Sequence, residues 1–383
     1  MTDRKPDGWS LGVGPEPNRM EMDLELELYT GLFISAMRAS LDALGSQMTM
    51  KRLASPFRLM GKSVYHFLIE FYPLKKDMIS AAFASRHSRL GIGCRMGPTY
   101  ITSKGCYCDT FECPYRDVLP EICSLICYYS AYGTSEEFDA DLEPIIFRLE
   151  EAGRLNCRMI IKIKGAANED SKGVGEPLAC INLTEVSPEM RTLWIGALNG
   201  NSWIYVTNSL VEVLGSEKAL EILGRHMRLL GNSLGLRLKN RLDEEGLDAL
   251  AINHLMEELN QAGHQEGKVV QMTKDEVVKE FTACPLSGSP MEIGAQFESF
   301  ANGVCEIINP DFEITHPQAM CRGDAKCIRV IARRSPLLEE GAPVSREQVN
   351  DDLTRNLALL KSRLAKGDIS LEEYRSLREV LLE

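Results

Sequence analysis

The sequence predicts an α+β fold made of two tandem copies of one helix-plus-antiparallel-sheet module, packed as a pseudo-dimer and followed by a C-terminal helical hairpin. Three observations lead to this prediction. The chain repeats itself along its length. Each copy groups helical patterns ahead of short β-branched runs, without the regular strand–helix alternation of a doubly wound sheet. Duplicated modules, finally, commonly keep the two-fold interface of a homodimeric ancestor.

The repeat is visible when the chain is compared with itself. The hexapeptide 58–63, RLMGKS, returns as RLLGNS at 228–233, and the tripeptide 44–46, LGS, returns unchanged at 214–216, so both are shifted by 170 positions. This many matches in one register exclude chance. Further pairs, with one residue gained midway, are Gly93 and Gly263, Cys94 and His264, Gly97 and Gly267, Cys113 and Cys284, Gly153 and Gly323, and Cys157 and Cys327.

The boundaries follow from composition. Residues 1–21, rich in Pro, Gly and charge, are expected to form an extended arm. The polar stretches 164–190 and 334–350 are expected to be linkers. The first copy therefore spans 22–163, the second 191–333, and the tail 351–383.

Within the copies, apolar residues three to four positions apart predict an amphipathic helix over 21–44. Each copy should continue with further helices, short strands, a Cys-Pro turn, another helix and a terminal strand. The Cys-Pro turn is Cys113-Pro114 in the first copy and Cys284-Pro285 in the second. The β-branched runs 157–163 and 327–332 are the terminal strands, because such side chains suit a half-buried sheet.

The tail carries leucines at helical spacing, interrupted by Lys366-Gly367-Asp368, which predicts a helix, a turn and a helix. Its sequence, LAKGDISLEEY over 364–374, resembles the short C-terminal domain found at the ends of many bacterial and archaeal proteins. The resemblance implies that residues 351–383 mediate homo-oligomerisation or docking of a partner protein.

Composition narrows the partners. A net charge of −12 and a pI near 5.2 lack the basic footprint that nucleic acid or an anionic membrane requires. No signal-peptide pattern opens the chain and no apolar run approaches the ~20 residues of a membrane helix, so we expect a cytoplasmic protein whose partner is a small-molecule ligand or another protein. Twelve cysteines in such a chain indicate metal or redox chemistry.

The sharpest local pattern lies in the second copy, where Cys305 is followed by Cys321 and Cys327 around a Gly-Asp turn. Such a turn lets both sulfurs face one point, which suits the tetrahedral Zn–S geometry of about 2.3 Å. The fourth ligand could be Glu306, Glu313, His316 or water. The alternative is that the three are small buried residues with reduced thiols. The first copy has only Cys157 at these positions.

The pattern of Cys305, Cys321 and Cys327 resembles that of the vinyl-reductase-type ligand-binding domain, which also serves as the aromatic-effector sensor of phenol-responsive regulators. In that family a Gly-x-Cys helix and a later Glu-x-x-Cys segment supply a zinc site beside a small-molecule pocket. The resemblance implies thiolate ligands at Cys305, Cys321 and Cys327. Gln318 stands where the family has its ligand glutamate, which leaves the fourth ligand open.

The Cys-Pro turn, the Asn309-Pro310 step and the closing Gly-Asp-x-x-Cys strand also resemble the aminothiazoline-carboxylate hydrolase family. This resemblance implies a metal-activated water that opens a cyclic C–N or C–S bond. The catalytic candidates are Cys284, His264 and His316. A structural turn explains Cys284 equally well, and a solvated loop residue explains His264.

The first copy has a thiol cluster of its own. Cys106 and Cys108 should share one face of a strand, and Cys123 and Cys127 one face of a helix, with Cys113 between them. Together they could hold zinc or an iron–sulfur cluster, although no ferredoxin spacing is present. The repeated Arg58 and Arg228 could contact an anionic ligand or form buried salt bridges with acidic helices.

Three functions are compatible with these patterns. The first is a zinc-containing small-molecule-binding module in the second copy, with the first copy as its structural partner. The second is the hydrolase described above. The third is an oligomerising scaffold that docks through its tail.

Overall fold

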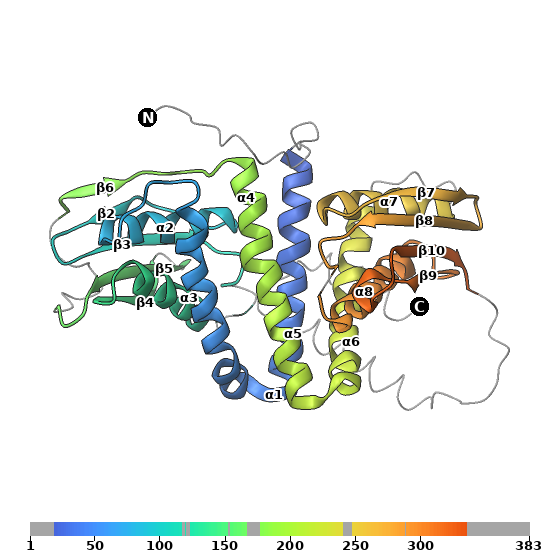
Figure 1. The fold of residues 1–383 in the computed structure, drawn as a ribbon, viewed down its shortest axis with the longest axis horizontal. Helices are drawn as coiled ribbons and strands as arrows, with labels where there is room; N and C mark the ends of the chain where they lie inside the picture. The colour runs from blue at the N-terminus through green and yellow to red at the C-terminus, as the bar shows by residue number, and fades with distance from the viewer. Residues whose placement is uncertain are drawn as a thin grey trace. The chain divides into compact units, whose positions relative to one another are not determined.

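The computed structural model describes residues 19–116, 119, 123–151, 154–166, 177–239, 247–287 and 289–334, and Figure 1 shows the course of the chain. The expected hairpin at 351–383 and most of the expected arm and second linker lie outside these residues. The α+β class is confirmed, because helices accompany two sheets whose strand pairs are all antiparallel. None of the described helices has the length and apolar run needed to cross a bilayer.

The first half of the chain begins with the long helix α1, which starts at Arg19 and so includes the last residues of the expected arm. Asp77 caps α2 by accepting a 2.8 Å bond from the Ser80 backbone N–H. The elements of this half are α1 (Arg19–Leu68), α2 (Met78–Gly91), β1 (Arg95–Met96), β2 (Thr99–Ile101), β3 (Gly105–Glu112), α3 (Cys123–Phe138), β4 (Leu142–Glu151), β5 (Arg154–Ile163) and β6 (Ala179–Ile181).

The second half follows the same order. A π-helical turn at Ile195–Gly200 joins its first two helices. The elements are α4 (Pro188–Trp194), α5 (Asn201–Leu214), α6 (Ser216–Lys239), α7 (Ala249–Ala262), β7 (Glu266–Met272), β8 (Glu276–Ala283), α8 (Met291–Ile308), β9 (Phe312–Gln318), a 3-10 turn (Met320–Arg322) and β10 (Cys327–Arg333).

The two sheets share one strand order. The first runs β4-β5-β3-β2-β6, with β1 also paired to β3, and the second runs β9-β10-β8-β7. The expected terminal strands are confirmed as β5 and β10. Sequence patterns missed their partners β4 and β9, each of which forms an antiparallel pair with the terminal strand of its half. The segment 164–190, expected as a linker, instead contributes β6 to the first sheet and the start of α4.

Glycines of the repeat occupy equivalent places. Gly45 breaks α1 at φ 73°, ψ 165°, and Gly215 separates α5 from α6 at φ 78°, ψ 160°, a region that favours glycine. A Cβ on Gly61 would lie under 3.0 Å from the Ser130 carbonyl oxygen, where α1 crosses α3. The crossing of α6 with α8 is built in the same way, with Gly231 against the Phe300 carbonyl. The partner helices contribute a glycine too: Gly133 of α3 lies against the Arg58 carbonyl, and Gly303 of α8 lies against the Arg228 carbonyl.

The structure corrects the register of the repeat at one loop. The helices α2 and α7 are offset by 171 positions rather than 170, since their capping residues are Asp77 and Asp248. Gly93, at φ 88°, therefore corresponds to His264, at φ 52°. His264 is the only non-glycine residue with positive φ in the described part of the chain. Cys94 accordingly corresponds to Gln265, not to His264.

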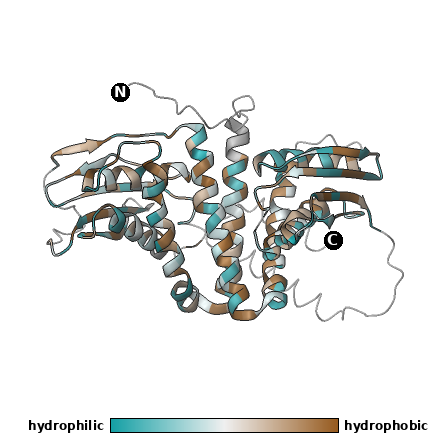
Figure 2. Cartoon of the chain, viewed as in Figure 1, coloured by the Kyte–Doolittle hydropathy of each residue, from teal (hydrophilic) through white to brown (hydrophobic). Residues whose placement is uncertain are grey.

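Helix α1 of the first half and helix α5 of the second half share one buried core. Leu28 and Leu32 of α1 and Val206 and Leu210 of α5 are all at most 1% exposed, and Figure 2 shows apolar residues running along both helices. Polar bonds join the halves as well. The Trp194 indole N–H donates to His87 Nδ1 of α2 (2.8 Å), and His264 bonds Glu25 of α1 (2.8 Å). Trp194 of α4 thus reaches α2 of the first half, and Glu25 of α1 reaches the loop that follows α7 in the second half.

Candidate functional site

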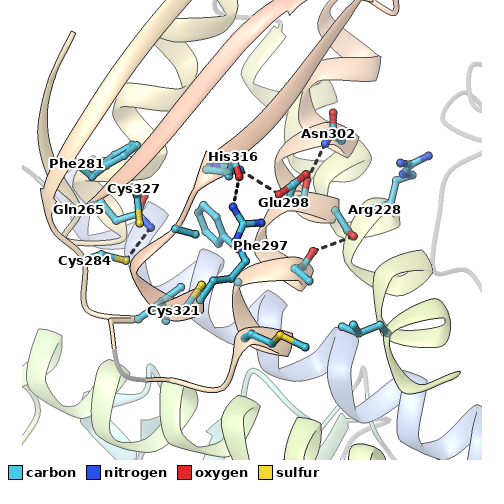
Figure 3. A pocket seen from close by; sticks show the side chains of 18 residues that line it. Arg228, Gln265, Phe281, Cys284, Phe297, Glu298, Asn302, His316, Cys321 and Cys327 are labelled. Carbon is cyan, nitrogen blue, oxygen red and sulfur yellow. Dashed lines mark hydrogen bonds and ion pairs between the residues drawn. The ribbon is translucent and has the colours of Figure 1, made fainter. Parts of the chain in front are cut away.

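A cavity of about 460 Å³ lies in the second half, between α8 and the ends of β8 and β10 (Figure 3). The register that pairs Cys327 with Phe281 brings the start of β10 beside the end of β8, so that residues far apart in sequence face the same space. Its apolar lining is Leu220, Phe281, Leu286, Met291, Ala295 and Phe297, and its polar lining includes Arg228, Gln265, Glu298, Asn302, His316 and Arg322, with three cysteines.

Among the residues that the structure describes, the first half has a cavity of about 60 Å³ between α1, α2 and α3, mostly at positions that do not correspond to the lining of the larger cavity. Tyr128, Tyr129 and Tyr132 of α3 stand where α8 has Glu298, Ser299 and Asn302, one helical turn apart. The three rings pack on one another, with centroids 5.4 Å and 6.0 Å apart. Bulky rings in the first half therefore stand at the positions where polar side chains border the larger cavity in the second half.

Three thiols meet at the larger cavity: Cys284, Cys321 and Cys327. The thiols of Cys284 and Cys327 interact with each other, and the Met320 backbone N–H donates to Cys327 Sγ over 3.1 Å. The interaction with Cys284 and then this N–H, against the cost of burial, lower the pKa of Cys327 to about 6. The pKa of Cys284 is raised by the same pair interaction and by burial.

Cys321 occupies the space next to a glycine of α8. A Cβ added to Gly294 would lie under 3.0 Å from Cys321 Sγ, so the glycine is required for this approach. Burial and the neighbouring Cys327 raise the pKa of the Cys321 thiol. The cavity wall at this point is therefore formed by a neutral sulfur held against bare backbone.

The polar side of the cavity is built around Glu298 and His316. His316 Nδ1 lies 3.5 Å from Glu298 Oε2, and Arg322 donates to the His316 carbonyl oxygen (Figure 3). Asn302 anchors the helix to β9, because its side chain donates to the Ile314 carbonyl (2.7 Å) and accepts from the Ile314 N–H (2.9 Å). Carboxylate, imidazole and guanidinium groups thus face one space.

The expected zinc ligands are only partly brought together. Cys321, Cys327 and His316 line the cavity, whereas Cys305 is fully buried in α8 and is not part of the lining. Among the residues that the structure describes, no three His, Cys, Asp or Glu side chains are grouped closely enough to hold a metal ion. The predicted donor set therefore does not fit a metal as it stands, and zinc stays a prediction from the sequence.

The catalytic candidates are also separated. Cys284 and His316 line the cavity, but His264 bonds Glu25, which also accepts from the Thr192 hydroxyl over 2.8 Å. The bond to Glu25 raises the pKa of His264 against the opposing effect of burial. His264 therefore joins the two halves instead of facing the cavity.

The five cysteines expected to form a cluster in the first half lie on three elements. Cys106 and Cys108 share the buried face of β3, as expected, and burial raises the pKa of both thiols. Cys123 and Cys127 lie on α3, where burial raises their pKa values to about 11 and about 12. Cys113 lies at the turn between them and interacts with a sixth thiol, Cys94, which sequence spacing did not indicate. An iron–sulfur cluster stays a prediction.

The repeated arginines form salt bridges. Arg58 makes two bonds to Glu136, of 3.0 Å and 2.6 Å, and Arg228 lies 3.2 Å from Glu306. The two acidic partners are themselves 170 positions apart in sequence. Both arginines thus form salt bridges, but their side chains are 43% and 52% exposed, so the predicted burial is wrong; Arg228 also borders the cavity.

Comparisons with protein-family models, with curated proteins and with solved structures found no match for this chain. The likeness to the vinyl-reductase-type domain and to the thiazoline hydrolases therefore rests on the short motifs alone.

Proposed function

We propose that the second half binds a small, largely apolar molecule in the 460 Å³ cavity and that the first half is its structural partner. The observation that carries this proposal is the cavity of about 460 Å³ itself, whose mostly apolar wall is interrupted by Glu298, His316 and Arg322. This volume lies in the range of small-molecule sites, and a mostly apolar wall with a few convergent polar groups is their usual character.

The lining indicates the ligand class. Phe281 and Phe297 supply aromatic surface to the cavity, while Glu298, His316 and Arg322 can meet one or two polar substituents. An aromatic or heterocyclic compound with a hydroxyl, amine or carboxylate group has these properties. The expected zinc is not part of this proposal, because Cys305 is enclosed in the core.

We also propose that the chain is a duplicated homodimer. The shared strand order, the equivalent glycine crossings and the equivalent salt bridges support this origin. Reciprocal contacts support it too, since α1 packs against α7 and α4 against α2. In a homodimer the two sites would be identical, so the duplication would allow their side chains to diverge.

The test is to close the larger cavity with a residue from the first half. Ser299→Tyr copies Tyr129, and Ser299 makes only a 3.1 Å bond to its own helix at Ala295. Phenol, benzoate and aminothiazoline carboxylate serve as probes, with binding followed by isothermal titration calorimetry and ligand-observed NMR on the full chain. We expect at least one probe to bind the wild type and to lose about tenfold or more in affinity in the variant.

Tyr129→Ser, the reciprocal change in the first half, is the matched control and should leave probe binding unaltered. Circular dichroism verifies that both variants are folded. Equal affinity in wild type and Ser299→Tyr, or the absence of binding by every probe, would overturn the proposal.

A further inference from the structure

A second pair of thiols lines one cavity in the first half of the chain. Cys94 follows α2 and Cys113 follows β3, and the two thiols interact with each other there. In the second half Cys284 corresponds to Cys113, but Gln265 corresponds to Cys94, with its Nε2 3.8 Å from Cys284 Sγ. The Cys94–Cys113 contact therefore belongs to the first half alone and needs an explanation of its own.

The two thiols border the small cavity of about 60 Å³ together with Ser85, Ser88 and Arg89. The Arg89 guanidinium lies 3.6 Å from the Met159 sulfur. Within the described residues, no carboxylate is at ion-pairing distance from it. A guanidinium in such surroundings attracts negative charge, because burial without an anionic partner is costly.

The charge that Arg89 can attract is the thiolate of Cys113. The interaction with Cys94, then the backbone N–H groups of Tyr115 and Arg116 together with Arg89, outweigh burial and lower the pKa of Cys113 to about 6. The same pair interaction, followed by burial, raises the pKa of Cys94. Cys113 is also partly exposed, whereas Cys94 is buried. A reactive thiolate beside a protonated thiol is the arrangement of redox-sensing cysteine pairs.

We propose that Cys113 and Cys94 form a peroxide-reactive dithiol, in which Cys113 is the attacking sulfur and Cys94 the resolving one. The Cys113 thiolate attacks one oxygen of hydrogen peroxide, the O–O bond breaks, and hydroxide leaves and takes up a proton to become water. The resulting Cys113 sulfenic acid then reacts with the Cys94 thiol, forming the S–S bond and releasing a second water. Two thiols are oxidised and one peroxide is reduced.

The size of the cavity selects the oxidant. About 60 Å³ admits a molecule of two heavy atoms, since one water needs roughly 10–15 Å³ on this measure. Glutathione disulfide is far too large to enter. The hydroxyls of Ser85 and Ser88 and the Arg89 guanidinium can hydrogen-bond both peroxide oxygens. The dithiol should therefore respond to hydrogen peroxide and resist oxidised glutathione.

The experiment treats the reduced full chain with one equivalent of hydrogen peroxide at pH 6 and maps the disulfides by differential alkylation and peptide mass spectrometry. N-acetylcysteine in the same solution is the reference thiol. At this pH about half of Cys113 is ionised, against roughly 0.3% of a thiol with a pKa near 8.5. A thiolate with a lower pKa is also a weaker nucleophile, here by about tenfold. The two factors together mean that Cys113 should react about tenfold faster than the reference thiol.

We expect a Cys94–Cys113 disulfide in the wild type and none with oxidised glutathione. Cys94→Ser should stop at a sulfenic acid on Cys113 that dimedone traps, and Cys113→Ser should form neither product. Cys180→Ser, at an exposed cysteine of β6, is the matched control and should behave as the wild type.

A disulfide from Cys113 to Cys127, first oxidation at Cys284 or Cys327, or a rate no higher than that of N-acetylcysteine would overturn the inference. Because the wild-type disulfide map is itself decisive, the test does not depend on the folding of any variant. It is also independent of ligand binding in the second half.

Discussion

The two halves of the molecule have the same backbone plan and different interiors. Helices cross at Gly61 in the first half and at Gly231 in the second, with backbone touching backbone in both. The side chains beside each crossing differ, because tyrosines line α3 at the positions where Glu298, Ser299 and Asn302 line α8. Contacts made by glycine and backbone leave no freedom for change, whereas contacts made by side chains can be exchanged one residue at a time.

The charges buried beneath the two sheets show the same divergence. In the second half Glu257 pairs with Lys279 and with Arg329, which is 1% exposed. The first half places Arg86 at the position of Glu257, and that guanidinium donates to the backbone carbonyls of Leu183 and Gly97. An ion-pair network in one half is thus replaced by backbone bonding in the other.

The largest expected effect tests whether the backbone plan is truly shared. Gly61→Ala and Gly231→Ala each place a Cβ against a carbonyl oxygen, so the crossing helices must separate. We expect each variant to lower the free energy of unfolding by about 3 kcal/mol, measured by urea denaturation followed by circular dichroism.

Gly196→Ala is the matched control, since nothing lies within 4 Å of its added Cβ, and it should leave stability within about 0.5 kcal/mol of the wild type. A large loss at one crossing and none at the other would show that the halves are not equivalent.

A smaller effect on stability should come from the titration of His87. This effect belongs to the first half alone, because the second half has Glu258 at the equivalent position. His87 is 1% exposed, and burial lowers its pKa to about 4. As the pH falls below about 6.5 the unfolded chain binds a proton that the folded ring does not, so stability falls with pH until about 4. Between pH 7 and pH 4.5 the expected loss is about 2 kcal/mol.

Melting temperatures between pH 4.5 and 7 measure this slope. His87→Gln should flatten it, while His254→Gln, at a side chain 72% exposed, should retain it. An unchanged slope in His87→Gln would assign the acid sensitivity to other groups.

The smallest effect concerns the bond between the halves at His264, whose pKa is raised by Glu25. A raised pKa means that the stabilisation is complete below about pH 6.5 and is lost as the pH rises through the folded-state pKa. His264 is 50% exposed, so solvent screening keeps the effect below about 1 kcal/mol.

His264→Gly, which copies Gly93, should abolish this alkaline loss in melting temperature and also relieve the positive φ. Thr192→Val removes the other side-chain bond to Glu25 without a titrating group, and should leave the loss in place. Loss of the pH dependence in both variants would contradict the assignment.

Patterns in the chain predicted the α+β class, the terminal strands and the face shared by Cys106 and Cys108. They missed β4 and β9, because the stretches at 142–151 and 312–318 contain proline and charges that weaken a strand pattern. They also misplaced the loop register at Cys94 and grouped Cys305 with cavity residues, since spacing along a helix does not reveal which side faces the core.

What the sequence determined by itself was local or repeated: the period, the glycines of the crossings and the strands with alternating residues. Tertiary structure decided which thiols touch. The pairing of β8 with β10 joins Cys284 to Cys327, and the packing of the α2 loop on the Cys-Pro turn joins Cys94 to Cys113. Each contact depends on two elements meeting in space. No spacing within a single element encodes it.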